Sequence, residues 1–219
     1  MPARLRPTAP IAPDAVLVGD PGRSLMLAQA LLEEPKMSNH ARGLWGYSGQ
    51  TPAGRQLSIQ ATGMGGPSAA LVLTDLAELG VRRAIRVGTC TALEPRLSLG
   101  QLLAIEEAHA WGGGGGGAPV LPDPRLSARL RLELGEVALA AAVASLDTLH
   151  GGGAPAPVGA GDVADMQTAA LFGRGRELGM ALAAVLIVTE TVAGAELESE
   201  AGELAARRAG AAAAASLSA

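Results

Sequence analysis

The fold follows from one stretch of sequence, Ala15-Val16-Leu17-Val18-Gly19-Asp20-Pro21-Gly22. Its first four residues are apolar without alternation, which is typical of a strand that is buried on both faces of a sheet. Asp20 suits the N-cap of a helix and Pro21 suits its first position, so a helix is predicted over roughly residues 23–32. A buried strand that runs directly into a helix indicates an α/β protein.

The same succession of strands and helices continues along the chain. Further apolar strands are predicted at residues 82–88, 101–105, 141–146 and 183–188. Helices are predicted after the tight loop 63–68 and at residues 123–140, 165–178 and 196–214. Residues 44–48 and 56–61 alternate loosely around a turn and predict a hairpin. We expect an α/β fold with three layers, in which helices flank a mainly parallel mixed central sheet.

Length and composition favour a single domain. The chain has 219 residues, of which 48% are hydrophobic, and this is enough to bury a full core. We predict one domain over residues 1–219, with an irregular N-terminal arm at residues 1–13 that lacks the apolar centre of a signal peptide. Six glycines at 112–117, and residues 151–161, which are only Gly, Ala, Pro and Val, predict two flexible loops.

Charge and composition argue against several kinds of partner. The net charge is −4, the isoelectric point is near 5.4 and no basic run is present, so nucleic acid is not expected as a partner. The longest apolar run, residues 181–188, is too short to span a bilayer, so no membrane contact is expected. A single cysteine fits a reducing compartment, and we predict a cytoplasmic protein. The histidines lack metal-ligand spacing, and neither a metal nor a cofactor is expected.

Arginines beside small residues indicate a site for a compact anion. Arg86 lies in an apolar strand, where its burial is costly without an anionic partner, and Gly88 and Thr89 follow it. Arg23 and Arg42 also have glycine neighbours. Because the guanidinium fork matches phosphate oxygens, inorganic phosphate is the natural candidate for the ligand. The alternative is that Arg86 pairs with a carboxylate inside the protein.

Four motifs along the chain point to a known family. They are Gly19-Asp20-Pro21-Gly22-Arg23, Arg42-Gly43-Leu44-Trp45-Gly46-Tyr47, Thr62-Gly63-Met64-Gly65-Gly66-Pro67-Ser68 and Arg86-Val87-Gly88-Thr89. In this order the chain resembles the nucleoside phosphorylase family, which includes hexameric purine nucleoside phosphorylases and uridine phosphorylases. The resemblance implies that a nucleoside and inorganic phosphate react to give a free base and ribose 1-phosphate. It also implies a homo-oligomer built from dimers, with a hexamer as the expected form.

The resemblance further implies which residues bind each part of the substrates. Phosphate is expected at Gly19, Arg23, Arg86 and Thr89, together with Arg42 from a neighbouring subunit. The ribose is expected at Met64, Met166 and Gln167, and the base is expected at Cys90, Thr91 and Glu190. Two of these residues are expected to act in catalysis, Glu190 as the acid toward the departing base and Arg86 at the phosphate.

Some of these positions depart from the family pattern. The family has a glutamate at the position of Gln167 and usually a glycine at that of Thr91, and its purine members have an aspartate at that of Glu190. The amide of Gln167 can still accept a bond from the ribose, but it lacks the charge that strengthens such bonds. The segment after residues 147–150, which carries base contacts in relatives, is cut to a Gly/Pro/Ala loop.

These departures leave several alternatives open. The preferred function is purine nucleoside phosphorolysis, and the others are uridine phosphorolysis, hydrolysis by a related nucleosidase, and a weakened family member that binds nucleoside or phosphate. At single residues, Gln167 is alternatively a plain helix residue, Glu190 a solvated strand end and Cys90 a small packing residue.

Overall fold

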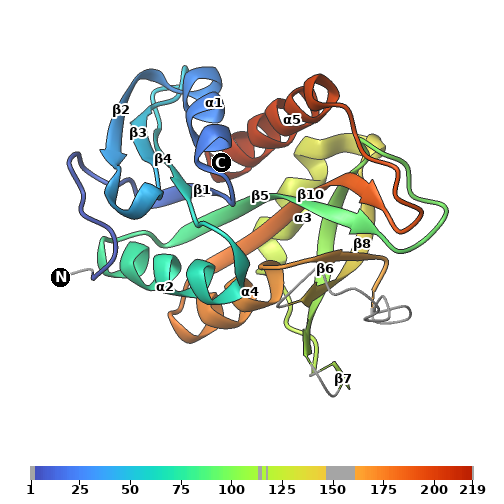
Figure 1. The fold of residues 1–219 in the computed structure, drawn as a ribbon. Helices are drawn as coiled ribbons and strands as arrows, with labels where there is room; N and C mark the ends of the chain where they lie inside the picture. Colours follow the sequence, from blue (N-terminus) through green and yellow to red (C-terminus); the bar gives the residue numbers. More distant parts are fainter. Residues whose placement is uncertain (1–2, 113–114, 117, 147–160, 219) are drawn as a thin grey trace.

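A mixed sheet runs through the molecule, and helices lie against both of its faces (Figure 1). The computed structural model describes residues 3–112, 115–116, 118–146 and 161–218. The strands are β1 (Asp14–Val18), β2 (Glu33–Asn39), β3 (Gly46–Gln50), β4 (Gln56–Ala61), β5 (Arg83–Ala92), β6 (Leu102–Gly112), β7 (Gly115–Gly116), β8 (Leu139–Leu146), β9 (Val163–Asp165) and β10 (Ala181–Thr191).

The strand pairing has an open part and a closed part. In the open part β1 is parallel to β4 and β5, and the antiparallel strands β3 and β2 continue outward from β4. In the closed part β5 pairs with β10, β10 with β6, β6 with β8, β8 with β9, and β9 with β5 again. These last strands therefore form a ring, and β5 belongs to both parts.

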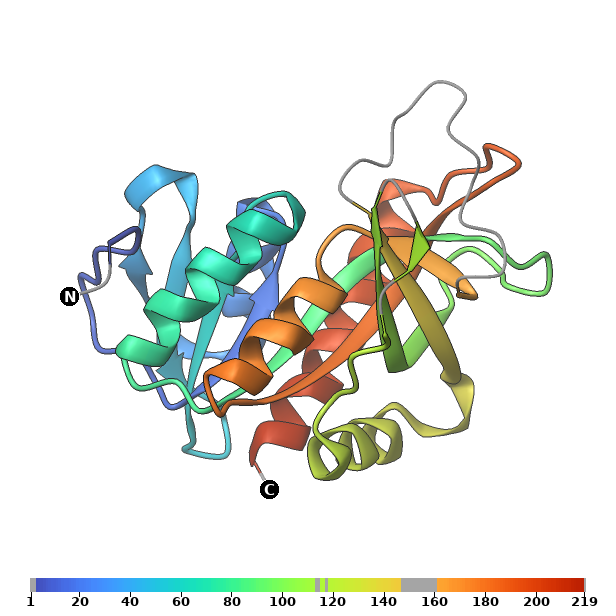
Figure 2. The ribbon, with the colours of Figure 1, turned by 90° about the horizontal axis from the view of Figure 1, so that it is seen from below.

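The helices divide between the two faces of the sheet. They are α1 (Pro21–Leu31), α2 (Gly65–Glu78), α3 (Pro124–Leu134), α4 (Thr168–Glu177) and α5 (Ser199–Ser218), with short 3-10 turns η1 (Ala41–Gly43) and η2 (Gly135–Val137). Apolar residues of α1, α3 and α5 build one core, whereas those of α2 and α4 build the other. Figure 2 shows α2 and α4 side by side on their face. Within the described part of the chain, no helix is long and apolar enough to cross a membrane.

Burial on both faces explains why the strands are apolar without alternation. In β1, Ala15 and Leu17 enter the core of α2 and α4, whereas Val16 and Val18 enter the core of α1, α3 and α5. Each side chain of such a strand is covered, so there is no polar face to alternate with. The expected α/β fold with a mixed central sheet flanked by helices is therefore confirmed.

The helix α3 is shorter than the sequence predicts. The helix predicted over residues 123–140 ends at Leu134, and Gly135 follows with a φ of 69°, a backbone conformation that favours glycine. The chain then enters β8 at Leu139, which pairs with Leu103 of β6. Alanine-rich residues 139–142 suit a helix locally, but pairing with β6 places them in the sheet.

The helix predicted over residues 165–178 begins later than expected. Asp165 is the last residue of β9, where it pairs with Ser145 of β8, and α4 starts at Thr168. Strand β2 was not predicted at all, because its sequence is charged and contains Pro35. Such a composition is tolerated at the edge of a sheet, which is where β2 lies.

The structure describes the predicted N-terminal arm and part of the two predicted loops. Residues 3–13 contain no helix or strand, yet Leu5 is fully buried. The glycine run 112–117 is not simply a loop, because Gly112 and Gly115 pair between β6 and β7. Of the second predicted loop, residues 151–160 lie outside the described part of the chain.

Candidate active site

A cavity of about 380 Å³ lies beyond the carboxyl ends of β1 and β4 and beside the middle of β5. It is lined by three loops that each lead into a helix, at residues 19–21, 63–65 and 165–167. Strand β5 adds Arg86, Gly88 and Thr89 to its wall. Because α1, α2 and α4 all begin here, three positive helix ends meet at one cavity, which favours an anion.

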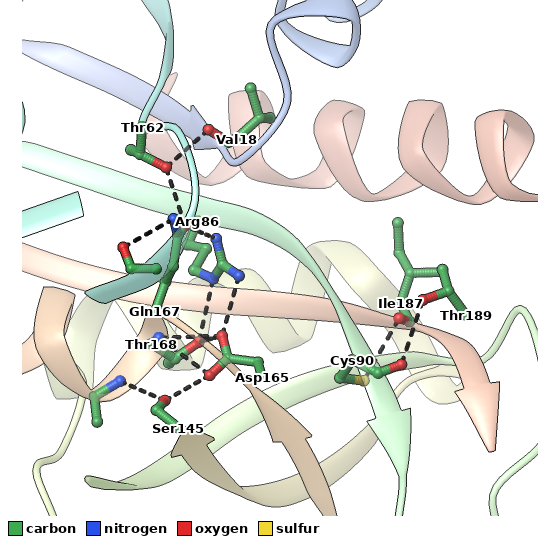
Figure 3. A network of polar contacts seen from close by, with 12 residues as sticks. Val18, Thr62, Arg86, Cys90, Ser145, Asp165, Gln167, Thr168, Ile187 and Thr189 are labelled. Carbon is green, nitrogen blue, oxygen red and sulfur yellow. Dashed lines mark hydrogen bonds and ion pairs between the residues drawn. The ribbon is translucent and has the colours of Figure 1, made fainter. Parts of the chain in front are cut away.

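Arg86 is almost fully buried in this wall, and its guanidinium is held from three sides (Figure 3). Nε donates to Thr168 Oγ1 at 3.2 Å, and Nη1 donates to Gln167 Oε1 at 2.6 Å. Nη2 forms an ion pair with Asp165 Oδ2 at 3.0 Å. The pairing with an internal carboxylate, raised above as an alternative, is therefore present. Since a guanidinium has five N–H donors and three are used, two remain for a ligand.

Asp165 is the centre of a network that the sequence did not reveal. Its Oδ1 accepts a hydrogen bond from Ser145 Oγ at 2.5 Å, and its Oδ2 accepts one from Thr168 Oγ1 at 2.6 Å. The backbone N–H of Thr168 also donates to this carboxylate. The carboxylate thus joins β8, β9 and α4 behind Arg86 (Figure 3). The sequence signal for it was weak: an aspartate three residues before a threonine, a spacing seen at helix starts.

Gln167 connects the same network to the loop before α2. Its Nε2 donates to Gly63 O at 2.7 Å and to Gly65 O at 3.3 Å. Its Oε1 accepts from Arg86 and, at 3.0 Å, from Thr62 Oγ1. The side chain is buried, with only 3% of its surface exposed. Its expected contact with a ribose stays a prediction.

Arg23 supplies a second cation to the cavity from the first turn of α1. Burial lowers the pKa of its guanidinium, Asp20 raises it, and the charge of Arg86 lowers it further. No described residue accepts a hydrogen bond from this guanidinium. Two neighbouring positive groups, one of them without a partner in the described chain, make a socket that an anion would complete.

Gly88 is required by the packing of Arg86. A Cβ atom at this position would lie 2.6 Å from the guanidinium carbon of Arg86 and 2.7 Å from Leu186 Cδ2. Any larger residue must therefore displace the arginine. This explains a glycine in the middle of an otherwise well-packed strand.

The structure gathers some of the predicted site residues and leaves others apart. Those that line the cavity are Gly19, Arg23, Met64, Arg86, Thr89, Met166 and Gln167. Those that do not line it are Arg42, Cys90, Thr91 and Glu190. Arg42 is exposed on η1 with a φ of 60°, on the chain's own surface. Its role in a neighbouring subunit's site stays a prediction.

The residues predicted for the base lie farther along β5 and β10. Thr91 and Glu190 face one another across these strands, with Thr91 Oγ1 at 3.3 Å from Glu190 Oε2, and Glu190 is exposed. Cys90 is buried in a core, and its thiol is 3.5 Å from Ile187 O. Burial raises the pKa of this thiol well above its ordinary value, so the described environment favours packing over nucleophilic chemistry. Within the described residues, no three potential metal-ligating side chains of His, Cys, Asp or Glu gather.

Comparison with known proteins identifies the family. The family model described as the Phosphorylase superfamily matches residues 13–219. The chain belongs to this superfamily. The resemblance drawn from the four motifs is therefore confirmed.

Relatives of this superfamily member include DeoD-type purine nucleoside phosphorylases. The protein from Oceanobacillus iheyensis is 39% identical over 99 residues, which are 45% of this chain and 42% of the relative. The one from Caldanaerobacter subterraneus is 38% identical over the same shares of both chains, and the one from Geobacillus kaustophilus is 42% identical over 40% and 37%. The matched stretch spans less than half the length of each relative.

A solved structure supports the fold of this superfamily member. The purine nucleoside phosphorylase of Toxoplasma gondii, solved in complex with immucillin-H, superposes with a TM-score of 0.84. The match covers 95% of this chain and 91% of the other, at 21% identity. At this identity the likeness concerns the fold alone.

Proposed function

We propose that the protein catalyses the phosphorolysis of purine nucleosides to a free base and ribose 1-phosphate. The observation that carries the proposal is the cavity in which Arg23 and Arg86 meet the first turns of three helices. Membership of the phosphorylase superfamily supports the reaction type. The purine preference rests on relatives named purine nucleoside phosphorylases.

Phosphate is the proposed co-substrate, and no cofactor is needed. The guanidinium of Arg23, the two unused donors of Arg86, the Thr89 hydroxyl and the backbone at Gly19 line the space for it. Each charge-assisted hydrogen bond contributes about 1.5–3 kcal/mol. Millimolar binding requires only about 4 kcal/mol, so two arginines suffice. Arg86 would also orient the phosphate for attack, which is its proposed part in catalysis.

The nucleoside is proposed to lie across the mouth of the cavity. Met64, which is 84% exposed, and Met166 offer apolar surface to the ribose beside Gln167. A phosphate oxygen would form the new bond to the anomeric carbon while the bond to the base breaks. Glu190 is proposed as the acid toward the departing base nitrogen, at the end where Cys90 and Thr91 also lie; because this carboxyl is exposed in the single chain, the role requires that bound substrate or a neighbouring subunit cover it, so that it takes up the proton that it then gives to the base.

We further infer a homo-oligomer built from dimers, with a hexamer as the expected form. Arg42 is exposed, and in the same segment Met37 and Trp45 are also 41% and 36% exposed. An interface there would cover apolar surface and bring Arg42 to a neighbour's cavity. A cytoplasmic location is inferred from the single cysteine, which suits a reducing compartment.

The test is the release of base from inosine, guanosine, adenosine and uridine, with and without inorganic phosphate. Phosphate-dependent release from the purine nucleosides alone supports the proposal. Release from uridine would redirect the assignment to a uridine phosphorylase, and release without phosphate would redirect it to a nucleosidase. If no base is released under any condition, the chain is a binding member of the superfamily.

A further inference from the structure

Gln167 contacts three walls of the cavity at once. Its Nε2 donates to Gly63 O and Gly65 O in the loop before α2, and its Oε1 accepts from Arg86 of β5. The residue itself precedes α4. Thr62 Oγ1 also lies 3.0 Å from Oε1, but its single proton is shared with Val18 O at the same distance, so Arg86 is the main donor to Oε1. The side chain is therefore held in one orientation.

This arrangement requires an amide. The two backbone carbonyls need donors, whereas Arg86 needs an acceptor, and only a side chain with both a carbonyl and an NH₂ group satisfies them together. A carboxylate of the same shape would face Gly63 O and Gly65 O with oxygen against oxygen. The loop and Arg86 could not then both keep their present contacts.

The charge balance around Arg86 also favours a neutral side chain at position 167. The positive charge of Arg86 is already matched by Asp165 at 3.0 Å. A neutral residue at 167 orients the guanidinium without a second negative charge, so the positive potential of the cavity is kept for a ligand. A carboxylate at 167 would compete with an incoming dianion for the same guanidinium.

We propose that Gln167 is a positioning residue for phosphate, which fixes Arg86 and residues 63–65 around the anion site while remaining neutral. The proposal rests on the proposed function in that phosphate is taken as the co-substrate. It differs from a sugar contact, because Gln167 acts through Arg86 and the loop instead of through the ribose hydroxyls. It also accounts for an amide where a charged acceptor would suit a ribose better.

The experiment measures the Kd of inorganic phosphate by calorimetry in the absence of nucleoside. The variants are Gln167→Glu, which adds a charge and removes both donors, and Gln167→Leu, which is neutral and removes every polar contact. Gln29→Glu is the control, because Gln29 is exposed on α1 and gains the same charge away from the cavity. Thermal melting with and without phosphate checks the fold of each variant and gives a second measure of binding.

The proposal predicts that Gln167→Glu raises the Kd about ten-fold or more, the value of one charge-assisted bond. Gln167→Leu should also raise it, by a smaller factor, and Gln29→Glu should not change it. The KM of nucleoside at saturating phosphate should change far less than the phosphate Kd. A rise in the nucleoside KM with an unchanged phosphate Kd would overturn the proposal in favour of a sugar contact.

The proposed function has a separate point of failure. If the unsubstituted chain binds no phosphate, the proposed function fails and this inference falls with it. If the unsubstituted chain binds phosphate and both Gln167 variants bind it equally well, only the inference fails. Phosphate binding without nucleoside cleavage would leave the positioning role testable and remove the enzymatic assignment.

Discussion

Arg86 is held by its own protein and still has donors to offer. Its ion pair with Asp165 meets the cost of burying a charge, and its bond to Gln167 fixes the plane of the guanidinium. A guanidinium fixed in this way loses little further freedom when a ligand arrives. Arg86 can therefore pair with Asp165 and bind an anion at the same time.

Replacing Arg86 should remove phosphate binding and also weaken the fold. Arg86→Ala leaves Asp165 buried without its cation, at a cost of about 3–5 kcal/mol in the free energy of unfolding. Arg86→Lys keeps the charge but not the fork, so phosphate binding should still be largely lost. Calorimetry with phosphate measures the loss of binding, and urea unfolding measures the loss of stability.

Arg96→Ala is the control for these Arg86 variants. It removes an exposed ion pair with Asp162 and should lower the free energy of unfolding by at most about 1 kcal/mol. Normal phosphate affinity in Arg86→Ala would refute the assignment of this site.

Gly88→Ala tests the same guanidinium without touching it directly. The new methyl group would start 2.6 Å from the Arg86 guanidinium carbon, so the arginine must move away from Asp165. We expect a loss of about 1–3 kcal/mol in stability, typical of overpacking, together with weaker phosphate binding. Gly173→Ala is the matched control, because its Cβ would meet nothing closer than 4.0 Å. Unchanged phosphate affinity in Gly88→Ala would show that Arg86 does not need its present position.

At the scale of elements, the N-terminal arm is fastened to α2 by one carboxylate. Asp75 is fully buried in α2, and its oxygens accept from the backbone N–H groups of Arg4 and Leu5 and from the Arg4 guanidinium at 2.9 Å. Burial alone would raise the pKa of Asp75, but these hydrogen bonds outweigh it and hold the pKa below the ordinary value of 3.8. The arm is thus irregular in conformation but anchored in place.

This anchor predicts a specific dependence of stability on pH. Because the pKa of Asp75 is lower in the folded chain, its contribution is fully present above pH 3.8 and is lost as the pH falls through the folded value. Asp75→Asn should lower the free energy of unfolding by about 1–3 kcal/mol at pH 7. The difference from the unsubstituted chain should shrink toward pH 3. Urea unfolding across this range is the measurement, and a gap that does not change with pH would contradict the assignment.

Features that depend on adjacent residues could be predicted from the sequence, whereas contacts between residues far apart in the chain could not. The strand Asp14–Val18 and the start of α1 at Pro21 were predictable, because apolar runs and helix caps are written in adjacent residues. Asp165 was not predictable as the partner of Arg86, since 79 positions separate them and only β9 brings them together. Strand β8 was partly missed for a similar reason, because its alanines become a strand through pairing with β6.

At the scale of the whole molecule, a site shared between subunits makes a distinctive prediction. Arg42→Ala and Arg86→Ala should each be inactive alone if one residue comes from each subunit. After the two are mixed and allowed to exchange subunits, some hybrid sites receive both intact arginines, and nucleoside phosphorolysis should return. The activity of the mixture against that of each variant is the measurement. A mixture as inactive as its components, with exchange verified by mass, would argue that Arg42 does not serve a neighbour.

The ring of strands has a consequence for uncontrolled pairing between the strand edges of different molecules. Strands that close on themselves offer no free backbone for another chain to pair with, whereas β2 ends the open part of the sheet. On β2, two charged residues and a proline, Glu33, Lys36 and Pro35, disfavour pairing with another strand. The N-terminal arm covers the end of β2 near Ser38, where the backbone N–H of Thr8 donates to Ser38 O. Loss of the arm would therefore uncover backbone groups that could pair with another chain, so this irregular segment protects the edge of the sheet.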